Sequence, residues 1–166
     1  MTAPDEREQR VYDVLTQLAI PYQRFEHPPV ATVEEAEQYW ASVDATHCKN
    51  LFLRNKKGDR HYLVVLRSDR QADLRSLVKT IGDDRLSFGS PERLMTHLGL
   101  TPGSVSPFGL INDRDHRVRP ILDASLRQAQ FLAFHPNVNT ATLRLSREDF
   151  ERFLAWSGHP VRWVEL

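Results

Sequence analysis

This chain contains only one cysteine and no long apolar run. Its 166 residues include one cysteine, so it can form neither an internal disulfide nor a metal site built from several cysteines. No apolar run reaches the ~18 residues that a membrane-spanning helix needs. The first residues are polar and acidic, unlike those of a signal peptide. We therefore expect a cytoplasmic protein with no membrane partner.

The net charge is zero, although basic and acidic residues are unevenly distributed along the chain. Residues 1–46 hold 3 basic against 9 acidic side chains (−6), residues 47–85 hold 10 against 5 (+5), and the remainder holds 9 against 8 (+1). Zero overall charge argues against a protein that coats long nucleic acids, and we expect no DNA partner. The basic middle segment leaves room for a local phosphate site. A solvated charged face is the alternative explanation.

The signatures of several common enzyme classes are missing too. The sequence has no Gly-x-Ser-x-Gly motif of a serine hydrolase. It also lacks the Gly-Lys-Ser/Thr ending of a nucleotide-hydrolase phosphate loop. Its histidines have no metal-ligand spacing with carboxylates or with one another. We expect no metal site and no cofactor.

Periodicity and capping residues predict interleaved helices and strands. Apolar residues spaced i, i+3, i+4 and i+7 indicate a helix over residues 5–19, and a capping box at Thr32 starts another toward Trp40. Asp73, Ser90 and Ser146 are expected to cap three more helices. Strands are expected at 22–26, 47–54, 60–67, 108–112, 118–123, 130–134, 140–145 and 161–165, with 113–115 at a hairpin tip. This irregular order favours one mixed α/β domain over residues 1–166, with a largely antiparallel sheet flanked by helices.

Lys49 lies within the strand predicted at residues 47–54, beside apolar neighbours such as Leu51 and Leu53. A lysine in a strand is usually a solvated edge residue. Here the apolar neighbours suggest that the strand is entering the core, and a partly buried ammonium needs a counter-charge. No carboxylate lies within five residues of it in that strand. A ligand phosphate would supply the negative charge.

Two loops could complete such a site. Residues 101–109 contain Gly103, Ser104 and Ser106 between stiffening prolines, and glycine there lets backbone N–H groups approach a ligand. An ordinary turn is the alternative reading of this loop. His135 follows an apolar strand and could orient a water molecule or hydrogen-bond a substrate group, or be a structural histidine. Cys48 is a weaker candidate nucleophile, because a strand cysteine is more often a small core residue.

These segments together resemble the YbaK/ProX-type aminoacyl-tRNA editing domains, and within them the freestanding alanyl-tRNA(Pro) deacylases. The resemblance covers nearly the whole chain. It is carried by residues 26–30 with 32–36, 49–53, 86–88 with 90–94, 103–113, and 135–137 with 139–142. It implies a partly barrel-shaped sheet and an enzyme that hydrolyses alanine wrongly esterified to proline tRNA. The implied partners are the acceptor end of tRNA(Pro) and either prolyl-tRNA synthetase or an elongation factor.

The resemblance also implies roles for individual residues. Lys49 corresponds to the key active-site lysine, which holds the phosphate end of the terminal adenosine, and His135 to the pocket histidine. The Gly-x-x-x-Pro loop of the family falls on Gly103 to Pro107. The implied catalytic set is Lys49, His135 and Gly103. The implied substrate-binding set is Asn50, Val30, Ala31, Val33, Ser104, Val105, Ser106 and Pro107.

A double sieve gives physical sense to this resemblance. A synthetase pocket sized for proline cannot strongly exclude alanine, because missing methylenes cost only about 1–3 kcal/mol. A second, narrower pocket can hydrolyse the wrong ester. Since no strong protein base is evident, we expect the 2′-hydroxyl of the substrate to assist the attacking water.

Two alternatives stay open. Ala31 stands where the family often carries a larger, frequently aromatic residue, so the substrate could be another small amino acid such as serine, cysteine or 2-aminobutyrate. The chain could also be a non-catalytic module that binds tRNA acceptor ends or a synthetase surface. The basic segment and the lack of a self-sufficient catalytic triad favour this last alternative.

Overall fold

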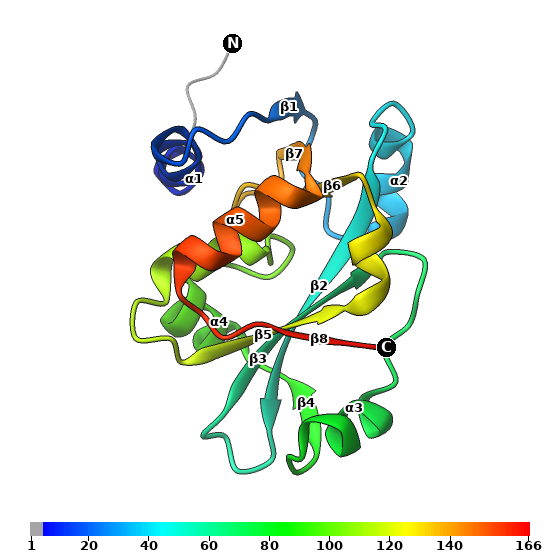
Figure 1. The fold of residues 1–166 in the computed structure, drawn as a ribbon, viewed down its shortest axis with the longest axis vertical. Helices are drawn as coiled ribbons and strands as arrows, with labels where there is room; N and C mark the ends of the chain where they lie inside the picture. The colour runs from blue at the N-terminus through cyan, green and yellow to red at the C-terminus, as the bar shows by residue number, and fades with distance from the viewer. Residues whose placement is uncertain (1–4) are drawn as a thin grey trace.

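A single mixed sheet organises the structure, a computed structural model that describes residues 5–166. Its strand order is β1-β7-β6-β2-β3-β5-β8, and β4 pairs with β2 off this path (Figure 1). The strands are β1 (Gln23–Glu26), β2 (Thr46–Asn55), β3 (His61–Arg67), β4 (Leu86–Phe88), β5 (Val118–Asp123), β6 (Phe131–Phe134), β7 (Ala141–Ser146) and β8 (Arg162–Val164). Their pairings are antiparallel for β1–β7, β2–β3, β2–β4 and β6–β7, and parallel for β2–β6, β3–β5 and β5–β8.

Helices cover both faces of this sheet. They are α1 (Glu6–Gln17), α2 (Val33–Trp40), α3 (Leu74–Ile81), α4 (Pro91–Leu98) and α5 (Arg147–Ser157), with 3₁₀ helices η1 (Pro107–Asn112) and η2 (Ala124–Gln128). The mixed α/β class predicted from the sequence is confirmed. The sheet does not close into a barrel, since within the described residues β1 and β8 end it at opposite edges. No helix in residues 5–166 is long and apolar enough to span a bilayer.

The central strand β3 explains why the core has two parts. All of its residues except Arg67 are buried, and its side chains alternate between the two faces. Leu63 and Val65 pack into the larger cluster, which includes buried residues of α1, α4 and α5. Val64 and Leu66 pack into a smaller cluster that includes Leu77 of α3. Because β3 is buried on both faces and pairs with β2, it fixes the position of β2 in the sheet.

The helix ends follow the predicted capping signals. The Ser90 side chain accepts a hydrogen bond from the Arg93 N–H, Pro91 is the first residue of α4, and Gly99 ends that helix in the left-handed conformation. Asp73 and Ser146 cap α3 and α5 in the same way. These predictions are confirmed because each depends on contacts within one turn of the chain.

One predicted strand is wrong. Residues 108–112 form most of η1 rather than a strand, so residues 113–115 are not the tip of a hairpin. The Ser106 side chain accepts a hydrogen bond from the Phe108 N–H, and Pro107 supplies the fixed φ of a first helical residue. Asp113, which the sequence places at an exposed tip, is buried and hydrogen-bonded to His159.

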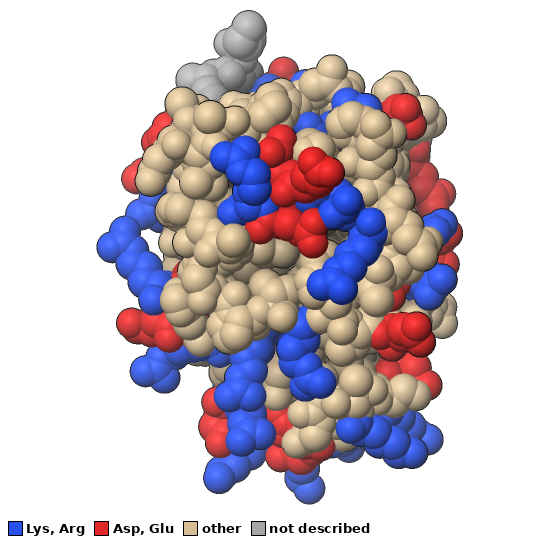
Figure 2. Space-filling view, viewed as in Figure 1, with Lys and Arg blue, Asp and Glu red and all other residues tan. Residues whose placement is uncertain are grey.

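Charge is distributed by region, as the sequence indicates. Figure 2 shows many basic side chains at the end of the molecule formed by the β2–β3 hairpin and α3. Acidic side chains gather on the same face near the middle of its upper half. The basic excess of residues 47–85 is therefore spread along β2, β3 and α3, and Lys49 lies near its beginning.

Candidate active site

The pairing of β2 leaves a gap beside Lys49. One edge of β2 pairs with β6 at Thr46 and His47 and with β4 from Leu53 to Asn55. Between these two pairings, residues 48–51 have a strand partner only on the β3 side within the described chain. A cavity of about 200 Å³ lies here, lined by Val30, Ala31, Thr32, Val33, Ala36, Trp40, Cys48, Lys49, Asn50, Gly103, Val105 and His135. This volume is smaller than the roughly 300–1,000 Å³ of ordinary small-molecule pockets.

Lys49 lines this cavity from a firmly held backbone position. It lies opposite Leu66 in the β2–β3 ladder and is half-buried. Its ammonium forms no ion pair within residues 5–166, so the positive charge has no counter-charge from the described chain. A cation at the rim of a small cavity is suited to an anionic group on a ligand.

Asn50 and Cys48 flank the lysine and differ in their chemistry. The Asn50 Oδ1 atom is buried and has no hydrogen-bond donor among the described residues, so a ligand N–H or O–H would satisfy it. Burial strongly raises the pKa of the Cys48 thiol. A thiol held in its protonated form is a poor nucleophile, which argues against the weaker cysteine candidate.

His135 presents one free ring nitrogen. Its Nδ1 lies 2.9 Å from the Ala141 carbonyl oxygen, which can only accept, so Nδ1 donates and the neutral ring keeps a lone pair on Nε2. Burial lowers the pKa of His135, and the nearby His27 lowers it further, while the bond to Ala141 acts in the opposite direction. The ring is therefore neutral near pH 7. It can accept a hydrogen bond from water or from a substrate hydroxyl.

The opposite wall is the segment before α2, and hydrogen bonds pin its backbone. The Asn139 Nδ2 atom donates to the Val30 carbonyl at 3.0 Å, and the Val30 N–H donates to the Asn139 carbonyl at 3.3 Å. Glu35 accepts the Ala31 N–H at 2.8 Å, while the Thr32 hydroxyl accepts the Glu35 N–H at 3.2 Å. These bonds hold the apolar side chains of the wall in place.

The glycine loop closes the cavity beside this wall. Gly103 has φ +89°, and a Cβ there would lie 3.9 Å from the Val30 carbonyl oxygen and 3.9 Å from the Ala31 Cα. The Ser104 N–H donates to the Thr101 carbonyl at 3.0 Å. The N–H groups of Gly103 and Val105 have no acceptor in the described part of the chain. They are free donors beside the cavity.

The structure brings together only part of the set named from the sequence. Lys49, His135, Gly103, Asn50, Val30, Ala31, Val33 and Val105 all line one cavity. Ser104, Ser106 and Pro107 do not line it: all three are buried, Ser106 caps η1, and Pro107 begins it. Ser106 and Pro107 instead form the start of η1.

Sequence reasoning missed Thr32, Ala36 and Trp40. The three residues recur at four-residue spacing from the start of α2, so one face of this helix borders the cavity. That spacing was visible in the sequence, but the direction of the face was not. The Trp40 ring stacks on His47, with ring centroids 4.5 Å apart, which fixes its position at the rim.

Comparison with known proteins assigns this chain to a family. The model of the aminoacyl-tRNA editing domain matches residues 27–153, a span that contains every residue lining the cavity. The chain belongs to the aminoacyl-tRNA editing domain family. This editing enzyme is thus an aminoacyl-tRNA deacylase, a hydrolase that cleaves the ester between an amino acid and tRNA.

Two relatives and one solved structure are similar to this chain. The editing enzyme is 43% identical to the prolyl-tRNA editing protein ProX of Acetoanaerobium sticklandii, over 95% of this chain and 96% of that protein. It is 36% identical to the prolyl-tRNA synthetase associated domain-containing protein 1 of Bos taurus, over 87% and 86%. A crystal structure described as a candidate trans-editing enzyme for prolyl-tRNA synthetase shares the fold, with a TM-score of 0.72, 21% identity and 99% of each chain covered.

Proposed function

We propose that this enzyme removes alanine from mischarged tRNA(Pro), with Lys49 anchoring the 3′ end. The observation that carries the proposal is the lone Lys49 ammonium beside a cavity of about 200 Å³. The relative that is 43% identical is named a prolyl-tRNA editing protein, which supports tRNA(Pro) as the substrate. The small cavity favours a small amino acid. In this proposal Lys49 binds the phosphate of the terminal adenosine.

The free polar groups of the cavity suit the steps of ester hydrolysis. A water oxygen attacks the ester carbonyl carbon, the bond from that carbon to the ribose oxygen breaks, and the ribose oxygen takes a proton. The His135 Nε2 lone pair can orient the water. The free N–H groups of Gly103 and Val105 can stabilise the developing oxyanion. The substrate 2′-hydroxyl assists the water, because among the described lining residues the cavity has no carboxylate to act as base.

Ala31 favours a second candidate substrate. Its small side chain lines the cavity, where a larger residue would take up more of the space. Serine, cysteine or 2-aminobutyrate esterified to tRNA would then be hydrolysed as well. Comparing alanyl, seryl, cysteinyl and 2-aminobutyryl esters on the same tRNA ranks these substrates. Preference for a non-alanyl ester would displace alanine.

Substitution of Lys49 by alanine tests the proposal. We expect Lys49→Ala to lower the deacylation rate of Ala-tRNA(Pro) by about 100-fold or more, because a misplaced ester loses its oriented attack. The melting temperature should stay unchanged, since the lysine makes no ion pair within residues 5–166. The matched control is Lys79→Ala, which removes an exposed lysine on α3. Unchanged turnover in Lys49→Ala would refute the anchoring role, and equal hydrolysis of Pro-tRNA(Pro) would refute the editing specificity.

A further inference from the structure

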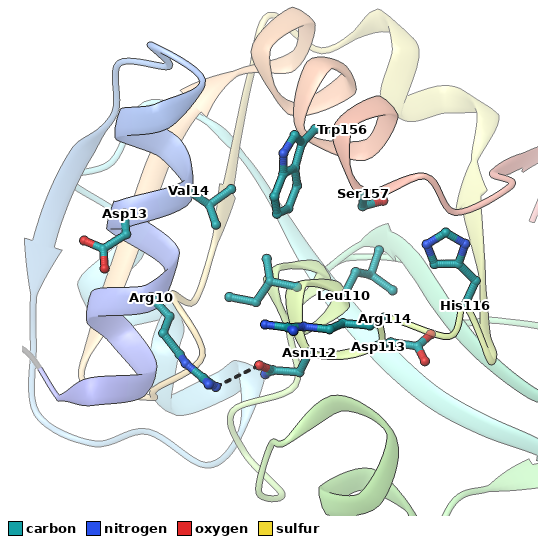
Figure 3. A pocket seen from close by; sticks show the side chains of 11 residues that line it. Arg10, Asp13, Val14, Leu110, Asn112, Asp113, Arg114, His116, Trp156 and Ser157 are labelled. Carbon is teal, nitrogen blue, oxygen red and sulfur yellow. Dashed lines mark hydrogen bonds between the residues drawn. The ribbon is translucent and has the colours of Figure 1, made fainter.

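A second and larger hollow lies between α1, η1 and α5. Its volume is about 800 Å³, and it shares no lining residue with the candidate active site. We name it the α1–α5 cleft. Figure 3 shows side chains from these elements and from the loop after η1 converging on it. Neither the family resemblance nor the proposed chemistry gives this cleft a role.

The upper side of the α1–α5 cleft is apolar. Trp156 is 40% exposed, which sets it apart from the buried aromatic residues of the core. Figure 3 shows its indole ring pointing from α5 into the cleft, toward Val14 and Leu110. The ring centroid of Trp156 lies 6.1 Å from that of Phe153, which is fully buried. The indole thus packs partly against the core, and its exposed part is available to a ligand.

The lower side of the cleft carries two arginines. Arg10 of α1 donates to the Asn112 Oδ1 atom at 3.1 Å, a bond drawn in Figure 3. Arg114 lies in the loop after η1 and is exposed. Neither guanidinium forms an ion pair within the described residues. Two unpaired cations beside an exposed indole ring suit a ligand that combines a flat ring with an anion.

The two carboxylates at the cleft are engaged elsewhere. Asp13 accepts a hydrogen bond from Gln9 at 2.9 Å, and Figure 3 shows its carboxylate directed away from the cleft. Asp113 accepts the Val118 N–H at 2.7 Å and lies 2.9 Å from the His159 Nε2 atom. Neither carboxylate forms an ion pair with Arg10 or Arg114, so both guanidinium groups remain available to an anion.

The loop that carries Arg114 is held in a fixed shape. His116 has φ +53°, a left-handed conformation that is unusual for a residue other than glycine. Its N–H donates to the Asp113 carbonyl at 3.1 Å, and its ring packs 4.4 Å from the ring of His159. Strained residues of this kind cluster at ligand sites, where the surrounding structure holds them.

We propose that the α1–α5 cleft binds one nucleotide of an RNA strand. The base stacks on Trp156, and the phosphate binds Arg114 and Arg10. Aromatic rings and guanidinium groups are the usual platforms for unstacked RNA bases. The choice of RNA as the source rests on the proposed function, since the editing site must receive a tRNA end. The glycine loop of that site continues directly into η1. The six residues of η1 rise by about 2 Å each, and the last of them line the cleft.

Binding of uncharged RNA tests this site without requiring any ester hydrolysis. The probe is an RNA hairpin with the acceptor-stem sequence of tRNA(Pro) and an unpaired 3′ end, measured by fluorescence anisotropy against the whole protein. Trp156→Leu should weaken binding by roughly 5- to 100-fold, because it removes the stacking platform. Trp156→Phe should restore most of it. Melting temperatures of both variants establish that the fold is intact.

The salt dependence of RNA binding gives a second test, which concerns the two arginines. Arg114→Ala and Arg10→Ala should each weaken binding and reduce the slope of log Kd against log salt by about 0.7, the value for one phosphate contact on a single strand. Arg119→Ala is the matched control, because Arg119 is an exposed arginine that does not line the cleft. It should leave the slope unchanged. An unchanged slope in both cleft variants overturns the proposal.

A parallel titration with AMP distinguishes a strand from a free nucleotide. If AMP binds more tightly than the hairpin and Trp156→Leu abolishes its binding, the cleft takes free nucleotides and the RNA assignment is overturned. If the hairpin binds through the cleft and Ala-tRNA(Pro) is not hydrolysed, the cleft stands and the proposed function alone fails. Full hairpin binding by Trp156→Leu and Arg114→Ala rejects the cleft and leaves the deacylase proposal intact.

Discussion

His135 is the titratable side chain of the candidate active site to which we assign a role in hydrolysis. Burial and the neighbouring His27 hold its pKa below the ordinary value of 6.5, so its neutral form persists at lower pH than for an exposed histidine. The Nε2 lone pair that we assign to orienting water is lost only when the ring is protonated.

The pH dependence of hydrolysis follows from this shift. We expect the single-turnover rate, corrected for uncatalysed loss of the ester, to stay level as pH falls through 6.5 and to decline only at more acidic pH. His135→Asn, which keeps a donor near the Ala141 carbonyl, should remove the acidic decline and lower the plateau. An acidic midpoint at or above 6.5 would contradict the assignment.

Ala31 is one of the residues that line the cavity, and its small side chain offers a test of the cavity width. Replacing it with methionine places a longer side chain in a cavity of about 200 Å³. Overpacking costs about 1–3 kcal/mol, so we expect hydrolysis of a 2-aminobutyryl ester to fall by roughly 5- to 100-fold, and that of an alanyl ester to fall less. Rates on the two esters measure the effect. Ala41→Met, at the exposed end of α2, is the control, and an equal fall for both esters would argue against a steric role.

At the scale of elements, the glycine loop depends on one left-handed residue. Gly103 has φ +89°, and a Cβ there would meet neighbours at 3.7–3.9 Å, which is ordinary contact. Gly103→Ala should therefore cost only backbone strain, about 1–2 kcal/mol of unfolding free energy. Because the loop lies over the cavity, we also expect slower deacylation. Urea unfolding and the deacylation rate are the two measurements.

Gly82 provides a matched control for this loop. It ends α3 with φ +72°, and a Cβ there would have no neighbour within 4 Å. Gly82→Ala should lose a similar amount of stability and keep full activity, since it lies outside the cavity lining. If both variants lose activity equally, the effect of Gly103→Ala reflects general destabilisation and not the loop.

The helices and strands also show how far local sequence signals can predict structure. Ser90, Pro91 and Gly99 predict α4 correctly because caps are decided within one turn. Residues 108–112 are mostly apolar, and such a short run does not distinguish a buried strand from a 3₁₀ helix. The Ser106-Pro107 pair was the local sign of a helix start, and the predicted strand overlooked it.

At the scale of the whole molecule, Asp113 joins distant parts of the chain. Its carboxylate accepts the Arg117 and Val118 N–H groups at 3.0 and 2.7 Å and lies 2.9 Å from the Nε2 atom of His159, so it ties η1 to β5 and to the segment before β8. Burial alone would raise the pKa of Asp113. The hydrogen bonds from His159, Val118 and Arg117 outweigh it and hold that pKa below the ordinary value of 3.8.

The loss of this carboxylate should lower global stability. We expect Asp113→Ala to reduce the unfolding free energy by about 2–4 kcal/mol, because buried donors are left unpaired. A lowered folded-state pKa means that the contribution of Asp113 is complete above pH 3.8 and is lost as pH falls below it, so the two proteins should converge in acid. Urea unfolding across this pH range measures the difference. The exposed Asp115→Ala is the control, and equal losses in both variants would contradict the network.

Local sequence signals predict the helix caps, the two strands of the β2–β3 hairpin, the mixed α/β class and the family motifs, because each depends on neighbouring residues or on a short pattern. The packing of distant segments leaves β2 unpaired on one edge beside Lys49. It also places Trp40 at the cavity and Ser104 and Ser106 outside it, and it brings Trp156 and Arg114 to a second cleft. Those outcomes depend on strand pairings and helix packing between residues far apart in the chain. Such long-range contacts are selected by burial over the whole molecule.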